Sequence, residues 1–106
     1  LCASNAEETE SIAKKHPDMM IVEIPELIGT GKAISTVNPE VVIDAINVIR
    51  KIDDRIFVIS GSGISTKDDV TKAVELGMQG VGASRAFVTA DNPKEVLTEM
   101  ALALIK

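Results

Sequence analysis

The feature that most constrains the fold is a regular alternation of short apolar runs with longer segments of helical spacing. The runs predict strands and the segments predict helices. Strict alternation of this kind is typical of parallel strands joined by right-handed helical crossovers. The predicted strands are a remnant at 1–3, the runs 19–22 and 56–59, and a weaker one over 79–83.

The helix starts carry recognisable capping sequences. Asn38-Pro39-Glu40 combines a capping side chain, a proline at the first helical position and an acid in the first turn. The other starts are at Ser4 or Asn5, at Ser65 or Thr66, and at Asp91-Asn92-Pro93. We therefore expect one α/β domain over residues 1–106. Two architectures fit, half of an eight-fold βα barrel or a small doubly wound sheet.

Three unusual loops follow the strands that end near Val22, Ile59 and Ala83. In both architectures the carboxyl ends of parallel strands meet at one edge, and ligands bind there. Glu23 ends its strand, and Pro25 forces the chain outward because it cannot donate to a strand ladder. This edge is therefore the predicted site, with Glu23 as the candidate general base.

The loops themselves suggest an anion. The small-residue sequences Gly29-Thr30-Gly31, Gly61-Ser62-Gly63 and Ser84-Arg85 expose backbone N–H groups that can bind a phosphate. A Gly-x-Gly alone is a weak signal that is usually just a turn, and neither of these continues as a nucleotide-binding fingerprint. Glu23 is equally a solvated carboxylate at a strand end, and Arg85 pairs either with a phosphate or with an acidic loop residue.

Other polar residues have simpler interpretations. We expect Lys32 to be a solvated loop residue and His16 to lie on the surface at the opposite, amino-terminal edge of the sheet. Cys2 has no nearby histidine to activate it, so we interpret it as a packing residue.

Composition excludes several classes of function. The net charge of −5 argues against a nucleic-acid surface. No apolar run approaches the ~20 residues that span a bilayer. One cysteine cannot make an internal disulfide or a multi-cysteine metal site. A cytoplasmic protein is the simplest interpretation. Because the chain opens at Leu1 directly into structured-looking sequence, we expect it to be part of a longer protein.

The segment Glu23-Ile-Pro-Glu-Leu-Ile-Gly-Thr-Gly31 resembles the catalytic-glutamate strand end and flexible lid loop of triosephosphate isomerases, in the form typical of archaeal members. The resemblance covers essentially the whole chain and implies the last four βα units of a (βα)8 TIM barrel. The further matching segments are Cys2-Ala-Ser-Asn5, Asn38-Pro-Glu-Val41, Gly61-Ser-Gly-Ile-Ser65 and Leu76-Gly77.

The resemblance implies that Glu23 interconverts dihydroxyacetone phosphate and glyceraldehyde 3-phosphate by moving protons between adjacent carbons through an enediol. A glutamate base beneath a closing lid is a well-known property of this family. Backbone N–H groups of the lid, the next loop and the last-strand loop hold the substrate phosphate in the family. They map to Ile28 and Gly29, to Gly63, and to Ser84 with Arg85. Neither a cofactor nor a metal is implied.

Two departures from the family pattern affect these assignments. Ile24 stands where the archaeal lid usually has a first proline. The family usually has Ala-Ser-Gly near the last loop, whereas Arg85 follows Ala83-Ser84 here. Alignment by motif therefore gives Ala83 with Ser84 as the phosphate pair, one residue earlier than alignment without gaps.

The family's electrophilic residues, an Asn and a Lys on the first strand and a His after the fourth, do not lie in this sequence. We therefore expect the fragment alone to be a very poor catalyst that needs the missing amino-terminal half-barrel. Uncovered sheet edges also favour pairing with that half or with another copy. Archaeal members of the family often form tetramers, so the resemblance implies a homo-oligomer. The alternatives are a phosphate-binding half-barrel module and, less consistently with one strand-end carboxylate, a phosphoacceptor receiver.

Overall fold

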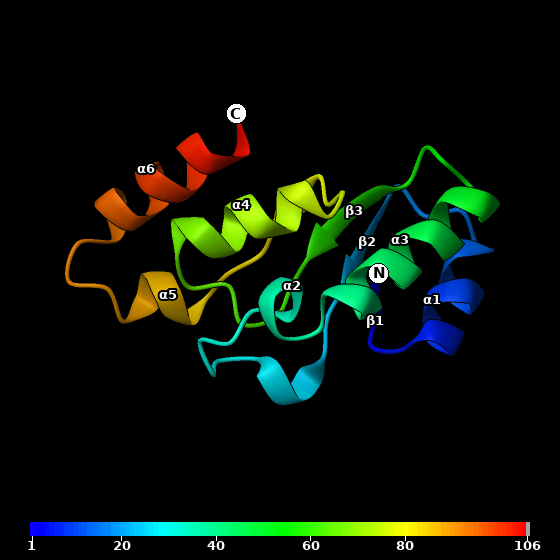
Figure 1. Cartoon of the computed structure of the whole chain (residues 1–106), viewed down its shortest axis with the longest axis horizontal. Helices are drawn as coiled ribbons and strands as arrows, with labels where there is room; N and C mark the ends of the chain where they lie inside the picture. The colour runs from blue at the N-terminus through cyan, green and yellow to red at the C-terminus, as the bar shows by residue number, and fades with distance from the viewer. Residues whose placement is uncertain (106) are drawn as a thin grey trace.

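Four strands form one parallel sheet in the computed structural model, which describes residues 1–105. The strands are β1 (Cys2–Ala3), β2 (Met19–Val22), β3 (Phe57–Ser60) and β4 (Gly80–Val81). They lie in the sequential order β1-β2-β3-β4, and each neighbouring pair is parallel (Figure 1). The predicted parallel α/β sheet is confirmed. Among the described residues the order lacks the reversal that a doubly wound sheet requires.

The helices follow the strands in the same progression along the molecule. In Figure 1 α1 and α3 lie together at one end of the longest axis, whose extent is 41 Å, while α4 lies in the middle and α6 toward the other end. Helix α3 packs against α1 and α2, while α4 packs against α2 and α6. The bounds are α1 (Ala6–Ala13), η1 (Pro25–Leu27), α2 (Ile34–Val37), α3 (Pro39–Ile52), α4 (Lys67–Glu75), α5 (Arg85–Val88) and α6 (Pro93–Leu104).

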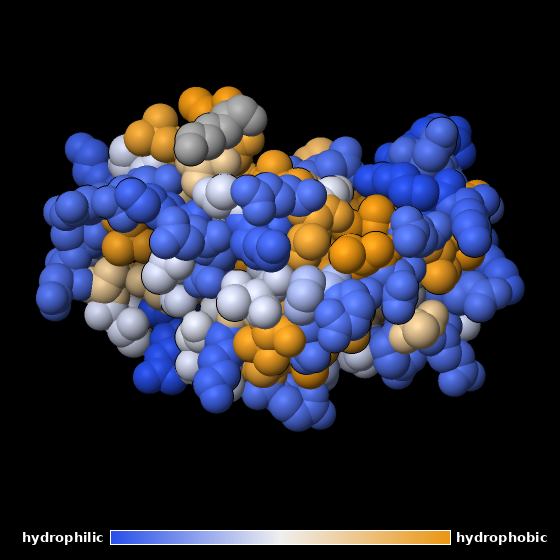
Figure 2. Space-filling model, viewed as in Figure 1, coloured by the Kyte–Doolittle hydropathy of each residue, from blue (hydrophilic) through white to orange (hydrophobic). Residues whose placement is uncertain are grey.

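The sheet is covered on one face and open on the other. Met20 and Val58 are fully buried, while their neighbours Met19 and Phe57 are 44% and 39% exposed. Parallel sheets normally have both faces covered, so this open apolar face is an unusual feature. Cys2 lies exposed near it, and the interpretation of Cys2 as a packing residue was wrong. On the side viewed in Figure 2, hydrophobic surface breaks into patches separated by hydrophilic residues.

Helix caps follow the sequence with one exception. The Asn5 side chain accepts from the Glu8 N–H, and Thr66 and Asp69 form a reciprocal capping box. The Asn92 side chain likewise accepts from the Glu95 N–H. Asn38 makes no side-chain cap, because its backbone is already the carboxyl end of α2.

The short helices α2 and α5 were missed. Each has only four residues, too few for a 3.6-residue period to be visible. In α5 the Val88 N–H donates to the Ser84 carbonyl. The predicted strand 79–83 is only Gly80–Val81, because glycines weaken a strand.

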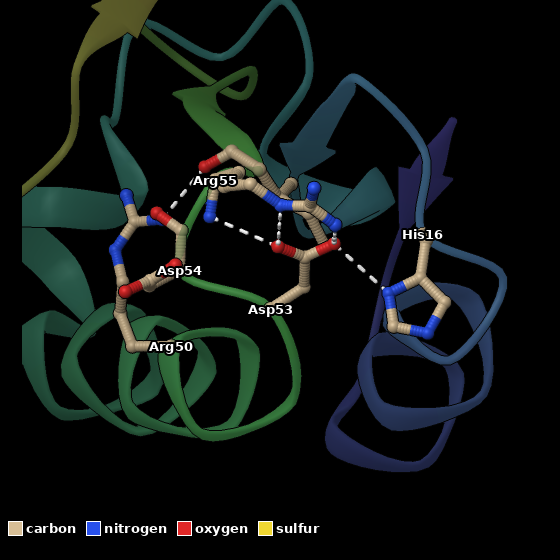
Figure 3. A network of polar contacts seen from close by, with 6 residues as sticks. His16, Arg50, Asp53, Asp54 and Arg55 are labelled. Carbon is tan, nitrogen blue, oxygen red and sulfur yellow. Dashed lines mark hydrogen bonds and ion pairs between the residues drawn. The ribbon is translucent and has the colours of Figure 1, made fainter.

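Asp53 ties together the chain at the amino-terminal edge of the sheet (Figure 3). Its carboxylate accepts from the Arg55 Nε at 3.0 Å and from the Arg55 Nη2 at 3.2 Å. The second oxygen lies 2.9 Å from the His16 Nδ1. His16 is exposed as predicted, and its φ of 53° turns the chain between α1 and β2.

These contacts determine how Asp53 titrates. Hydrogen bonds from the Arg55 side chain, then from His16, then from the Arg55 backbone N–H hold the pKa of the Asp53 carboxyl well below its usual range. A carboxyl whose pKa is lowered by folding contributes stability above its unfolded pKa of about 3.9. That stability is lost as the pH falls toward its folded pKa.

We expect Asp53→Asn to lower the free energy of unfolding at pH 6 and to make it less dependent on pH below about 5. The reason is that the amide keeps the shape of the side chain but cannot carry the charge that Arg55 favours. Urea unfolding of the full-length protein at pH 6 and pH 3.5 measures both effects. Asp54→Asn is the control, since its carboxylate makes no hydrogen bond or ion pair within residues 1–105. Equal pH dependence in wild type and Asp53→Asn contradicts this account.

Candidate functional site

Glu23 is the first residue after β2, as predicted, and lies at the carboxyl edge of the sheet. Its backbone N–H donates to the Ala3 carbonyl at 3.0 Å, which continues the pairing of β2 with β1. Its side chain lies over Gly61, where an added Cβ would meet the Glu23 Oε2 at 3.0 Å and the Ile21 Cγ2 at 2.3 Å. The Ile21 side chain therefore requires glycine at position 61, and the Glu23 carboxylate also lies close to that glycine.

The loop between β2 and α2, residues 23–33, has local structure of its own. Pro25 begins the single 3₁₀ turn of η1. After it, Thr30 Oγ1 donates to the Leu27 carbonyl at 2.6 Å and accepts from the Lys32 N–H at 3.1 Å. Gly29 and Gly31 have φ values of 73° and 76°, which glycine adopts without strain. We call this segment the lid loop. Short-range hydrogen bonds hold its turns.

The loop after β3, residues 61–66, holds both ends of the lid loop. At one end the buried Ser62 Oγ accepts from the Ile24 N–H at 3.0 Å. At the other end the Ser62 carbonyl accepts from the Ile34 N–H at 3.2 Å, and Ser65 Oγ donates to the Gly31 carbonyl at 3.3 Å. Sequence reasoning missed Ser62 and Ser65. A hydroxyl between glycines at a strand end was the available signal.

Gly63 is the tightest point between these two loops. Its φ is 74°, and an added Cβ would lie 1.8 Å from the Lys32 carbonyl oxygen. No side chain fits at that distance, so the contact requires glycine for space as well as for conformation.

The third loop reaches the lid loop through Arg85. Ser84 and Arg85 follow the short strand β4 and begin α5. The Arg85 Nη1 donates to the Gly29 carbonyl at 2.5 Å. Among residues 1–105, the Arg85 guanidinium therefore bonds a backbone carbonyl and not the acidic loop residue that was one of its two predicted partners.

The three loops enclose one open cavity of about 330 Å³. It is lined by all five predicted substrate-binding residues, namely Ile28, Gly29, Gly63, Ser84 and Arg85. Ala83 also lines it, so the cavity accommodates both alignments of the last loop. Arg85 is the one charged side chain among these lining residues. The cavity is thus a set of backbone groups and small side chains with a single cation, which suits a small anion.

Glu23 does not line that cavity. It lines a neighbouring one of about 320 Å³, together with Ser4, Asn5 and Ile24. Gly61 joins the two regions, because it lines the first cavity and contacts the Glu23 side chain. The structure thus brings the five predicted binding residues together and places the predicted base beside them, one glycine away.

Residues 1–105 contain no group of three or more His, Cys, Asp or Glu side chains placed to hold a metal ion. No helix in this described part of the chain is long and apolar enough to cross a membrane.

The family model described as triosephosphate isomerase matches residues 3–101. Curated relatives include the triosephosphate isomerase of Methanobrevibacter smithii, 43% identical over 94% of this chain. Those of Sulfurisphaera tokodaii and Methanopyrus kandleri are 36% and 40% identical over 100% and 94% of it.

These relatives are considerably longer than the chain. It spans 45%, 46% and 44% of their respective lengths.

One solved structure also shares the fold. The crystal structure of an Amycolatopsis orientalis BexX/CysO complex superposes with a TM-score of 0.79 at 19% sequence identity. The match covers 99% of this chain and 39% of the other. With a family model matching nearly its whole length, the chain belongs to the triosephosphate isomerase family.

Proposed function

We propose that the whole protein interconverts dihydroxyacetone phosphate and glyceraldehyde 3-phosphate in the cytoplasm, as a step of glycolysis and gluconeogenesis. One observation carries the proposal. In a chain of this family, a strand-end carboxylate lies one glycine away from a cavity formed by the three loops expected to hold the phosphate.

Glu23 acts as the base in this proposal. It removes a proton from one carbon of the triose and returns it to the neighbouring carbon through an enediol. Triosephosphate isomerase is itself a standard example of a glutamate base beneath a closing loop, so this chemistry is carried over from the family. The position of Glu23 over Gly61 supports it, because Gly61 also lines the cavity expected to hold the phosphate.

The phosphate is held by the backbone N–H groups of Ile28 and Gly29, of Gly63, and of Ser84 with Arg85. The shared cavity supports this assignment, as does the positive φ of Gly29 and Gly63, which turns successive N–H groups toward one side. A cavity of about 330 Å³ also lies within the range of small-ligand sites.

This chain supplies the carboxyl-terminal half of a TIM barrel, and an amino-terminal half completes it. The exposed apolar residues of the open sheet face support that arrangement, as does the share of about 45% of the relatives' length. The missing half contributes the electrophilic residues, so the fragment alone is inactive. The complete protein assembles as a homo-oligomer.

The alternative is a phosphate-binding half-barrel module without isomerase activity. The observation in its favour is that all five predicted binding residues line the cavity of about 330 Å³, here called the anion cavity, while Glu23 lies outside its lining. The two functions make different demands on Glu23.

We expect Glu23→Gln to lower kcat of the full-length protein by a factor of about 10² to 10⁴ with little change in KM. The amide keeps the shape but cannot accept the proton, and that is the typical contribution of a general base. Initial rates with glyceraldehyde 3-phosphate measure the effect. Glu26→Gln is the matched control, an exposed carboxylate three residues along the same loop. Nearly intact activity of Glu23→Gln rules out its assignment as the base.

We expect Gly63→Ala to raise KM by about tenfold and to destabilise the protein by more than the ~1–3 kcal/mol of a strained backbone. The added Cβ would meet the Lys32 carbonyl at 1.8 Å and push the two loops apart. Gly31→Ala is the control, since its φ of 76° imposes the same strain while its nearest contact is 4.0 Å away. Kinetics and urea unfolding of both variants check this. Equal losses in the two variants refute the close-contact explanation.

We expect residues 1–106 alone to lack activity and to recover it on co-expression with the amino-terminal half of the protein. The open apolar face of the sheet has to be covered for the barrel to close. Activity of the co-purified halves, against each half alone, measures this. Full activity of the fragment by itself would show that the electrophilic groups are not required.

A further inference from the structure

Arg85 makes the longest-range side-chain contact at the site. Its Nη1 donates to the Gly29 carbonyl, 56 positions away in the sequence. The Arg85 Cδ also lies 4.0 Å from where a Cβ on Gly29 would be, so its stem lies against the same turn. Within the short helix α5 and its carboxyl end, Thr89 Oγ1 donates to the Arg85 carbonyl at 2.7 Å, which stabilises this turn of the chain. One side chain thus spans from the last-strand loop to the middle of the lid loop.

The other anchors of the lid loop are of a different kind. Ser62 and Ser65 bind it near its two ends, at Ile24 and Gly31, and both anchors come from the loop after β3. These are contacts of neutral groups. Arg85 binds between them, at Gly29, from the other side of the cavity and with a charged donor. Hydrogen bonds from charged donors are the stronger ones.

The guanidinium has donors to spare. It carries five N–H groups in a planar fork, and the Gly29 carbonyl takes one of them. Arg85 also lines the anion cavity as its one charged side chain. A single guanidinium can therefore donate to the lid carbonyl and to an anion in the cavity at the same time, whereas a lysine ammonium lacks this planar geometry.

We infer that Arg85 is a positioning residue that latches the lid loop at Gly29 and strengthens this latch when an anion occupies the cavity. The identification of this anion as the substrate phosphate rests on the proposed function. The latch itself rests on the Arg85–Gly29 bond. When an anion is bound, the guanidinium donates to the anion and to the Gly29 carbonyl at once, and the two acceptors hold it in one orientation. The bond to Gly29 then breaks less often, so ligand binding orders the lid loop.

The test is hydrogen exchange of the lid amides in the full-length protein, with and without inorganic phosphate. Ile28, Thr30 and Lys32 report on the lid, since their N–H groups bond within it. In wild type we expect phosphate to slow their exchange. In Arg85→Gln we expect about tenfold faster exchange without phosphate, and almost no response to phosphate, from the loss of one charged hydrogen bond. Lys94→Gln, an exposed cation on α6, is the control for charge alone.

Arg85→Lys separates a latch from a merely structural contact. It keeps the charge, so we expect phosphate to inhibit it nearly as in wild type, while the phosphate-dependent slowing of lid exchange is largely lost. Lid exchange and phosphate response within twofold of wild type in Arg85→Gln overturn the inference. So does a full coupled response in Arg85→Lys.

Failure of the proposed function gives a different result. Then wild type does not isomerise triose phosphates, yet the exchange measurement still decides whether Arg85 holds the lid. If wild type isomerises and Arg85→Gln leaves exchange unchanged, the latch alone is wrong.

Discussion

The contact between Gly63 and the backbone of Lys32 and Ala33 is the constraint on which the site depends. Two loops from neighbouring strands approach so closely here that a Cβ would overlap a carbonyl oxygen. Because the loops approach so closely, residues of both loops line one cavity. Ser62 adds two hydrogen bonds between the same two loops. Its side-chain oxygen accepts from the Ile24 N–H, and its carbonyl accepts from the Ile34 N–H. The loop after β3 therefore supports the lid loop through these contacts.

The parallel sheet explains why these loops meet at all. Strands β2, β3 and β4 are in register, with Val22 beside Ser60 and Ser60 beside Val81, so they end at one level. The loops that directly follow these strands therefore start at the same edge of the sheet. The opposite edge has a different role, since Asp53, Arg55 and His16 join the turns there by charge and hydrogen bonding. The cavity-lining residues and the charged residues that join the turns thus lie at opposite ends of the same strands.

Much of this could be predicted from the sequence, because the signals were local. Runs such as Met19–Val22 and starts such as Asn5 and Thr66 depend on neighbouring residues alone, and the structure has them where expected. The contacts that could not be predicted join distant segments. Nothing near Arg85 in the sequence indicates a carbonyl at Gly29, and nothing near Ser62 indicates the N–H of Ile24. Short elements were missed for a different reason, since α2 and α5 end before a helical period can appear.

The separation of Glu23 from the anion cavity has a physical consequence for any reaction at this edge. The carboxylate and the cavity share the backbone of Gly61, and the cavity also shares Gly63 with the lid loop. A movement of residues 61–66 therefore changes the space beside Glu23 and the geometry of the anion site together. Arg85 hydrogen-bonds the lid loop at Gly29, so in the proposed latch an anion held by its guanidinium also acts on the loop that begins at Glu23. The proposed base and the proposed anion cavity are therefore joined through the backbone of Gly61, although Glu23 is not among the residues that line the cavity.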